Sequence, residues 1–127
     1  METLHLDTHA AIWLYAGEVE QFSPHARDLL EDAALYISPM VLLEIQYLKE
    51  AGRVNVKVDT FLRDMNDMLG LQISKAAFAA VTLEAARLSW TRDPFDRMIV
   101  AQALVDEARL LTRDRVILKH CRQAVWS

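Results

Sequence analysis

Cysteine and glycine are both scarce in this chain of 127 residues, and each scarcity excludes a class of protein. The only cysteine, Cys121, cannot form an internal disulfide, which excludes a disulfide-stapled fold and agrees with a reducing compartment. With only three glycines, the chain has no Gly-rich loop that could cradle a nucleotide phosphate. No zinc-binding pair or serine nucleophile elbow is present either, because His120 and Cys121 are adjacent, which suits zinc poorly.

Long apolar runs are also missing, although hydrophobic residues make up 53% of the chain. No run approaches the ~20 residues that a membrane-spanning helix needs. The N-terminal residues 1–5 include an acid and lack the positive charge and apolar core of a signal peptide. We therefore expect a cytoplasmic protein in which residues 1–127 form a single domain with a real hydrophobic core.

The chain also lacks a net positive charge. The formal net charge of −4 argues against a protein that coats nucleic acid by bulk attraction. Local binding stays open, because basic residues gather near the C-terminus and could contact phosphates, or equally could form a solvated surface. These residues are Arg92, Arg97, Arg109, Arg113, Arg115, Lys119, His120 and Arg122.

Short apolar segments alternate along the chain with longer helical patterns. Strands are predicted at residues 4–6, 35–37, 71–73, 109–112 and 124–126. Helices are predicted at residues 10–16, 24–32 and 39–50, from a cap at Asp59 or Thr60 to Gly70, from an N-cap at Ser74 to about Trp90, at residues 94–107, and as a turn or short helix at 116–118. The alternation of Val54, Val56 and Val58 with polar residues favours an extended segment. Strands separated by helices predict an α/β fold with a mainly parallel sheet covered on both faces.

Two acids stand at the start of the predicted central helix, in the stretch Asp93-Pro94-Phe95-Asp96. Asp93 suits the N-cap and Pro94 the first helical position, while Asp96 lies near the positive end of the helix dipole. The almost wholly apolar residues that follow predict that the helix is buried. Taken alone, the two acids are also explained by capping of this helix.

Three further acids occupy positions where a ligand could bind. Asp7 and Asp114 follow predicted strands, and ligands of open α/β sheets bind outside the carboxyl ends of the strands. Each could instead only cap a helix or begin a turn. Glu44 falls on the apolar face of its helix, with Val41 and Leu48 one turn away, so its charge needs either a basic partner or a metal ion.

Clustered carboxylates repel one another, and a hard divalent cation neutralises them. Mg²⁺ and Mn²⁺ take oxygen ligands and leave positions free for phosphate oxygens, which favours phosphodiester hydrolysis as the chemistry of such a site.

Four short motifs that span nearly the whole chain carry a family resemblance. They are Leu6-Asp7-Thr8-His9, Ser38-Pro39 with Leu43-Glu44-Ile45, Asp93-Pro94-Phe95-Asp96-Arg97, and Leu111-Thr112-Arg113-Asp114. In this order and at these spacings they resemble PIN-domain ribonucleases of the VapC toxin type. The resemblance implies a PIN-like α/β/α sandwich with a short, mainly parallel sheet of four to five strands.

The resemblance also implies an activity and partners. It implies an Mg²⁺- or Mn²⁺-dependent endoribonuclease that cuts tRNA or rRNA and stops translation, a VapB-like antitoxin, a homodimer and a higher toxin–antitoxin complex. Asp7, Glu44, Asp96 and Asp114 would be the metal ligands, and none of the four acids departs from the pattern.

Other matched residues would support these ligands. Thr8 and Thr112 could hold water or a carboxylate. Asp93 could be a further site acid or only the N-cap, and Arg97 could steady a carboxylate, touch phosphate or form a surface salt bridge.

Two other functions are compatible with the same residues. A phosphotransferase or phosphatase could use Asp7 as nucleophile, but the second acid expected two residues later is replaced by His9. A non-catalytic RNA- or protein-binding module could keep the fold without turnover.

Overall fold

The computed structural model describes all 127 residues, which form five strands, seven α-helices and one short 3₁₀ helix. The strands are β1 (Thr3–Leu6), β2 (Ala34–Ile37), β3 (Gln72–Ile73), β4 (Arg109–Leu111) and β5 (Ala124–Val125). The helices are α1 (Thr8–Ala16), η1 (Val19–Gln21), α2 (Pro24–Asp32), α3 (Pro39–Glu50), α4 (Val58–Leu69), α5 (Phe78–Ala85), α6 (Pro94–Val105) and α7 (Arg115–His120). None of the helices combines the length and the apolar character that crossing a membrane requires.

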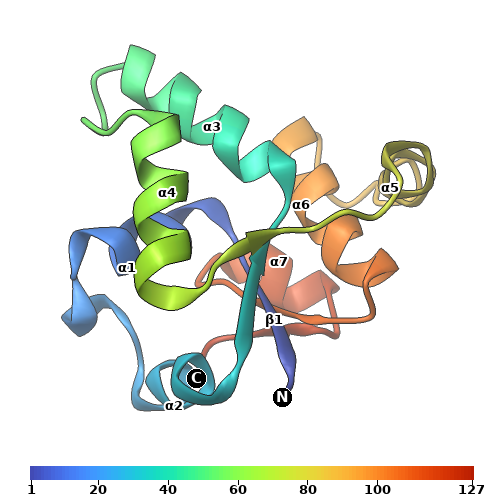
Figure 1. Cartoon of the computed structure of the whole chain (residues 1–127). Helices are drawn as coiled ribbons and strands as arrows, with labels where there is room; N and C mark the ends of the chain where they lie inside the picture. Colours follow the sequence, from blue (N-terminus) through green and yellow to red (C-terminus); the bar gives the residue numbers. More distant parts are fainter.

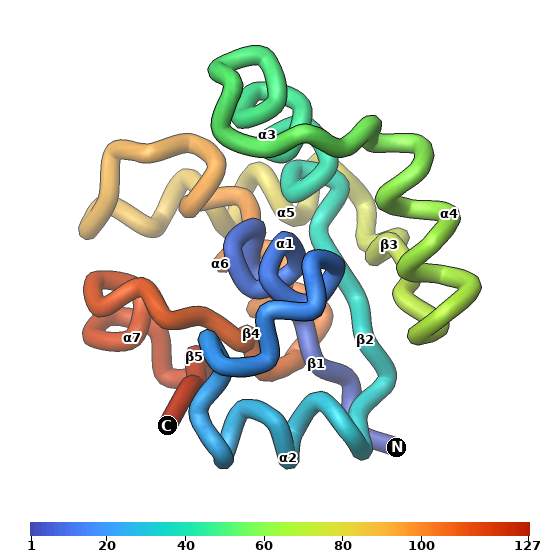
Figure 2. The backbone as a smooth tube through the Cα atoms, turned by 90° about the vertical axis from the view of Figure 1, so that its left-hand side faces the viewer, coloured from blue at the N-terminus to red at the C-terminus, as the bar shows by residue number.

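All five strands lie in one parallel sheet with the order β3-β2-β1-β4-β5. The first strand is central, and Leu4 lies opposite Leu35 on one side and Arg109 on the other (Figure 2). In Figure 1, α1 and α6 lie on opposite sides of β1, so that the sheet is covered on both faces. The predicted α/β/α sandwich is confirmed.

Side chains of β1 point alternately to the two faces of the sheet, and both faces are buried. Leu4 and Leu6 are fully buried in a main core of 21 residues, while His5 between them is also fully buried. A strand apolar on one face and still buried on the other is expected when helices cover both sides. A smaller core of four residues, Val81, Ala85, Met98 and Ala101, joins α5 to α6.

Three helices begin in the way that the sequence predicts, with a capping side chain followed by proline. The side chains of Ser23, Ser38 and Asp93 accept hydrogen bonds from backbone N–H groups in the first turns of α2, α3 and α6. At the other end of α1, Gly17 has the left-handed φ of 72°, as predicted for the residue that ends a helix.

The predicted start of α5 is wrong. Ser74 caps no helix, and α5 begins four residues later at Phe78. The Ser74 hydroxyl donates to Asp106 at 2.6 Å, and its oxygen accepts from the side-chain amide of Gln102 at 2.9 Å and from the backbone N–H of Ala76 at 3.4 Å. The helix ends at Ala85 rather than near Trp90, and only Val81 and Ala85 of its predicted apolar face are buried. A polar partner that is distant in sequence therefore overrides the local capping pattern.

The segment before α4 agrees with the prediction, whereas the start of the helix does not. Val54 and Val56 lie in an irregular segment in which partly buried and exposed residues alternate, and both valines pack against the main core. Helix α4 begins at Val58, ahead of the predicted caps Asp59 and Thr60, and no side chain caps it. Burial of Phe61 and Met65 on one face of the helix explains a start without a cap.

Candidate functional site

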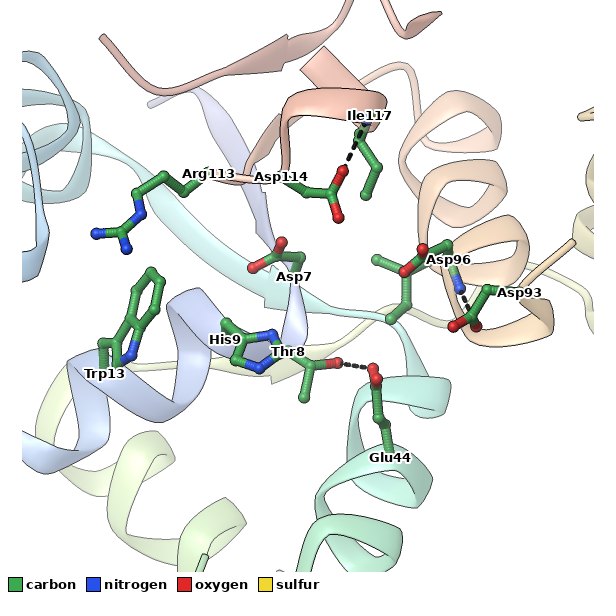
Figure 3. A pocket seen from close by; sticks show the side chains of 11 residues that line it. Asp7, Thr8, His9, Trp13, Glu44, Asp93, Asp96, Arg113, Asp114 and Ile117 are labelled. Atoms are coloured by element: carbon green, nitrogen blue, oxygen red, sulfur yellow. Dashed lines mark hydrogen bonds between the residues drawn. The ribbon is translucent and has the colours of Figure 1, made fainter. Parts of the chain in front are cut away.

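One cavity of about 360 Å³ contains most of the residues predicted to form a site (Figure 3). Its lining is Asp7, Thr8, His9, Trp13, Glu44, Asp93, Asp96, Ile99, Arg113, Asp114 and Ile117. The structure thus brings together the four acids predicted as metal ligands, with Asp93 beside them. Asp7, Asp96 and Asp114 lie at the starts of α1, α6 and α7, and Glu44 lies within α3, so the four acids come from segments far apart in the sequence.

Three of these acids are also helix caps. Asp7 Oδ1 accepts from the backbone N–H of Ala10 at 2.9 Å at the start of α1. Asp93 caps α6 and Asp114 caps α7 in the same way, each accepting two backbone N–H groups at 2.8–3.2 Å. Capping and a place in the cavity are therefore compatible, because the cap fixes one carboxylate oxygen and leaves the other able to accept a further contact.

Two threonine hydroxyls donate hydrogen bonds to carboxylate oxygens of Asp7 and Glu44. Thr112, which is fully buried, donates to Asp7 Oδ2 and accepts from the backbone N–H of Asp114 at 3.1 Å, so it links two site acids. Thr8 donates to Glu44 Oε1. Glu44 is in no salt bridge, so the structural ion pair that the sequence left open is not formed.

Burial and neighbouring negative charge raise the pKa values of two cavity acids, Asp96 and Asp7. Burial, followed by the negative charges of Asp93, Asp114, Glu44 and Asp7, raises the pKa of Asp96 to about 7. Burial also raises the pKa of Asp7, although hydrogen bonds from Thr112 and Ala10 oppose the shift. The cavity therefore holds a proton near neutral pH that a cation would displace.

The residues fit a hard divalent cation in their chemistry. All the acidic groups offer oxygen ligands, and no Lys or Arg forms a salt bridge with Asp7, Glu44, Asp96 or Asp114. No three His, Cys, Asp or Glu side chains are arranged so that they could hold a metal ion as they lie. A site with few direct protein ligands suits Mg²⁺, which keeps several of its waters.

Not every residue has the predicted place. Arg97 is not among the residues that line the cavity; its Nε donates to the carbonyl of Thr91 at 2.8 Å, and it forms no salt bridge with a carboxylate. The site prediction did not include His9, Trp13 or Arg113, which do line the cavity. The sequence offered one signal for them, their nearness to the predicted acids: Trp13 lies one helical turn after His9, which closely follows Asp7, and Arg113 precedes Asp114.

Comparison with known proteins identifies the family. Residues 4–123 match the family model described as PIN domain. The chain belongs to the PIN-domain family. A relative, Ribonuclease VapC22 of Mycobacterium tuberculosis, is 31% identical to this PIN domain over 126 residues, which cover 94% of this chain and 93% of the relative.

Solved structures share the fold of this PIN domain at low sequence identity. The VapBC2 complex of Rickettsia felis, bound to a promoter DNA fragment, contains a chain with a TM-score of 0.68 and 18% identity, covering 98% of this chain and 99% of that one. A toxin–antitoxin complex from Klebsiella pneumoniae matches with a TM-score of 0.62 and 16% identity, covering 97% and 96%. DNA-bound VapBC of Salmonella typhimurium matches with a TM-score of 0.58 and 19% identity, covering 98% and 96%.

Proposed function

We propose that this PIN domain is a metal-dependent endoribonuclease and the toxin of a toxin–antitoxin pair. The observation that carries the proposal is the convergence of Asp7, Glu44, Asp96 and Asp114 on one cavity without a cationic partner. The similarity over nearly the whole chain to a protein named as a ribonuclease supports it. The substrate would be RNA, with tRNA or rRNA as the targets whose cleavage stops translation.

In this proposal the four acids hold Mg²⁺ or Mn²⁺. The ion would offset the negative charge of a phosphodiester and make a water molecule easier to deprotonate. Thr112 and Thr8 orient the carboxylates of Asp7 and Glu44, a task that hydroxyls outside the ligand set often perform. Asp96 can hold or release a proton near neutral pH, and Asp93 keeps the first turn of α6 in place.

The alternative in which Asp7 is a phosphotransferase nucleophile lacks one of its acids. Such an enzyme needs a second acid two residues after the nucleophile, and His9 stands at that position and lines the same cavity.

The proposal extends to partners. The three solved complexes similar in fold are named as VapBC or toxin–antitoxin assemblies, and we propose that this chain likewise binds a VapB-like antitoxin and forms a homodimer and a higher complex with it. The cytoplasm, where tRNA and ribosomes lie, would be its place of action. A small open reading frame adjoining this one, whose product copurifies with the chain, would be the direct evidence for the antitoxin.

The decisive experiment compares cleavage of purified total RNA with and without a divalent cation. We expect cleavage in Mg²⁺ or Mn²⁺, none in EDTA, and a loss of at least ~100-fold in Asp96→Asn, because the amide removes a charged ligand without changing the shape of the side chain. The matched control is Asp67→Asn, which changes an exposed acid of α4 outside the cavity and should leave cleavage unchanged.

Other outcomes would point elsewhere. Full activity in a folded Asp96→Asn protein would refute the site assignment. A covalent aspartyl-phosphate would indicate a phosphotransferase, and RNA binding by the wild-type protein without cleavage would indicate a binding module.

A further inference from the structure

Arg113 is the only lysine or arginine that lines the acidic cavity. Its guanidinium carbon lies 4.7 Å from the centroid of the Trp13 ring, within the range of a cation–π contact. Its Nη1 donates to the side-chain Oε1 of Gln21 at 2.9 Å and to the backbone carbonyl of Gln21 at 3.4 Å. Figure 3 shows the Arg113 side chain beside Trp13, directed away from Asp114.

The acids around Arg113 do not neutralise its charge in a salt bridge. Five carboxylates line the same cavity, yet Arg113 forms no salt bridge with any of them. Its Nε and Nη2 donate no hydrogen bond within the protein, and the side chain is exposed. Trp13 and Gln21 therefore keep an arginine at the mouth of an acidic cavity with free donors and an unneutralised charge.

The aromatic ring under Arg113 has a fixed position. Trp13 contacts the edge of Trp126 at a centroid distance of 6.0 Å and that of Phe22 at 6.3 Å. Phe22 and Trp126 are buried and stack on each other at 5.3 Å. Because this cluster joins α1 to the segments after η1 and β5, the support for Arg113 is part of the core rather than a mobile surface contact.

A polyanionic substrate explains such an arrangement. The protein carries a net charge of −4 and five acids line the cavity, so an RNA backbone that enters the cavity needs a cation to offset the negative charge there. A guanidinium with free, coplanar N–H donors matches the geometry of a phosphate group. We propose that Arg113, positioned by Trp13, binds the phosphodiester group of the RNA strand next to the one that is cleaved.

This inference rests on the proposed ribonuclease function, and binding can be measured apart from cleavage. The probe is a fluorescein-labelled single-stranded oligoribonucleotide, titrated by anisotropy in Mg²⁺ with proteins that also carry Asp96→Asn so that the probe stays intact. Adding Arg113→Ala should weaken binding by about tenfold or more. It should also reduce the slope of log affinity against log salt concentration by about 0.7, the value for one phosphate contact of a single strand.

Two further variants separate charge from position. Arg113→Lys keeps the charge but not the planar fork, so it should keep the salt slope and bind between wild type and Arg113→Ala. In proteins that carry Asp96→Asn, Trp13→Leu should weaken binding when Arg113 is present and have little further effect when Arg113→Ala is added, since a residue that acts through another is coupled to it. The matched control is Arg63→Ala, an exposed arginine of α4 outside the cavity, which should change neither affinity nor slope.

In the cleavage assay, without Asp96→Asn, Arg113→Ala should raise KM by a similar factor and leave kcat nearly unchanged. Unchanged affinity, salt slope and KM in a folded Arg113→Ala protein, while the wild type cleaves RNA, would overturn this inference alone. Arg113-dependent binding by a wild-type protein that cuts no RNA would overturn the ribonuclease proposal and keep the phosphate contact. No binding of the probe by any form of the protein would overturn the inference.

Discussion

Asp96 is the cavity acid whose pKa is raised to about 7. Its carboxylate makes no hydrogen bond in the structure, and burial together with four neighbouring acids raises its pKa from 3.8 to about 7. Asp7 lies in the same cavity, but hydrogen bonds from Thr112 and Ala10 partly stabilise its charge. An added cation would therefore stabilise the charged form of Asp96, which no hydrogen bond stabilises within the protein.

The raised pKa of Asp96 predicts a dependence of stability on pH in the metal-free protein. Between about pH 4 and pH 7 the folded state binds this proton and the unfolded state does not, so the free energy of unfolding falls as the pH rises through this range. Asp96→Asn removes the charge. The variant should be more stable than wild type at about pH 8, by about 1–2 kcal/mol because the side chain is partly open to water, and equally stable near pH 4.

Urea unfolding in EDTA at both pH values would measure this difference. Asp67→Asn is again the control, because its carboxylate is exposed and outside the cavity. A stability difference between Asp96→Asn and wild type that does not change with pH would contradict the assignment of the proton to Asp96.

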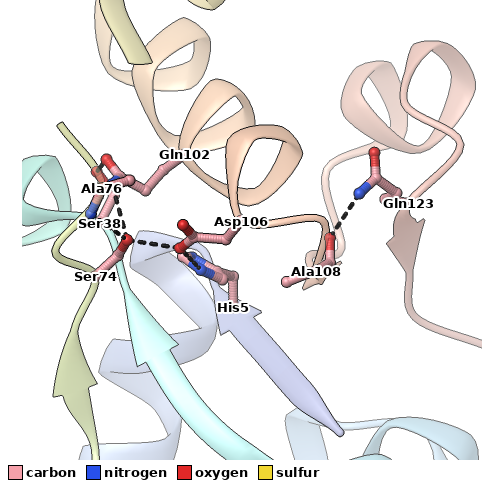
Figure 4. Close-up of polar contacts among 8 residues, drawn as sticks. All are labelled: His5, Ser38, Ser74, Ala76, Gln102, Asp106, Ala108 and Gln123. Carbon is pink, nitrogen blue, oxygen red and sulfur yellow. Dashed lines mark hydrogen bonds and ion pairs between the residues drawn. The ribbon is translucent and has the colours of Figure 1, made fainter. Parts of the chain in front are cut away.

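The far end of α6 is held by a chain of buried polar contacts. His5 of β1 donates through Nε2 to Asp106 at 2.8 Å, and Ser74 after β3 donates to the same oxygen at 2.6 Å (Figure 4). Gln102 of α6 links Ser74 to Ser38, the cap of α3, at 2.9 and 3.2 Å. Burial lowers the pKa of His5, which leaves a neutral ring whose Nδ1 has no partner. Helix α6 thus presents Asp96 to the cavity at its N-terminal end. Its other end is linked to His5 of β1, to Ser74 after β3 and to Ser38, the cap of α3.

Removing Asp106 should loosen this attachment. In Asp106→Ala the Nε2–H of His5 and the hydroxyl of Ser74 lose their acceptor while they remain buried, which should cost about 2–4 kcal/mol of unfolding free energy. Thermal and urea unfolding would measure the loss. Glu107→Ala, an exposed neighbour, is the control, and an equal effect of the two substitutions would show that the network contributes little.

At the scale of elements, the sequence predicts what depends on local patterns and misses what depends on distant partners. The capped and proline-led starts of α2, α3 and α6 are predicted because capping residue and helix are adjacent. Ser74 carries the same local signal, but its hydroxyl donates to Asp106 and accepts from Gln102, which lie 32 and 28 residues away. The pattern of Val54 and Val56 reports burial against the core and not pairing in the sheet.

The candidate site follows the same rule. The convergence of the acids could be predicted from their positions. Asp7 and Asp114 follow strands, and parallel strands end at one edge of the sheet. Asp96 lies in the first turn of a helix, and Glu44 lies on the apolar face of another. Their hydrogen bonds to Thr8 and Thr112 agree with a supporting place for both threonines, whose role in holding a metal stays a prediction. The place of Arg113 over Trp13 could not be predicted, because it depends on how Phe22 and Trp126 fix the ring.

The molecule as a whole leaves large apolar side chains exposed on α5. Phe78 and Leu83 are 71% and 69% exposed, and α5 is packed mainly against α6. Exposed apolar side chains that gather on one element often belong to an interface between proteins. They offer a surface for the proposed homodimer that is separate from the cavity.

We expect the purified chain to sediment as a dimer, and the double variant Phe78→Ser with Leu83→Ser to shift towards monomer. Each serine removes apolar area whose burial contributes about 1.5–3 kcal/mol when complete. Met68→Ser is the control, since Met68 is 63% exposed on α4. A wild-type chain that stays monomeric well above micromolar concentrations would contradict the homodimer.

The strand order has a consequence for the gene. Central strand β1 is made first, and its neighbour β4 is made near the end of synthesis, together with the Asp114 that follows it. A ribosome that stops anywhere before codon 114 therefore releases a fragment that lacks one of the four acids. A single premature stop codon in most of the reading frame is therefore enough to remove Asp114 from the cavity.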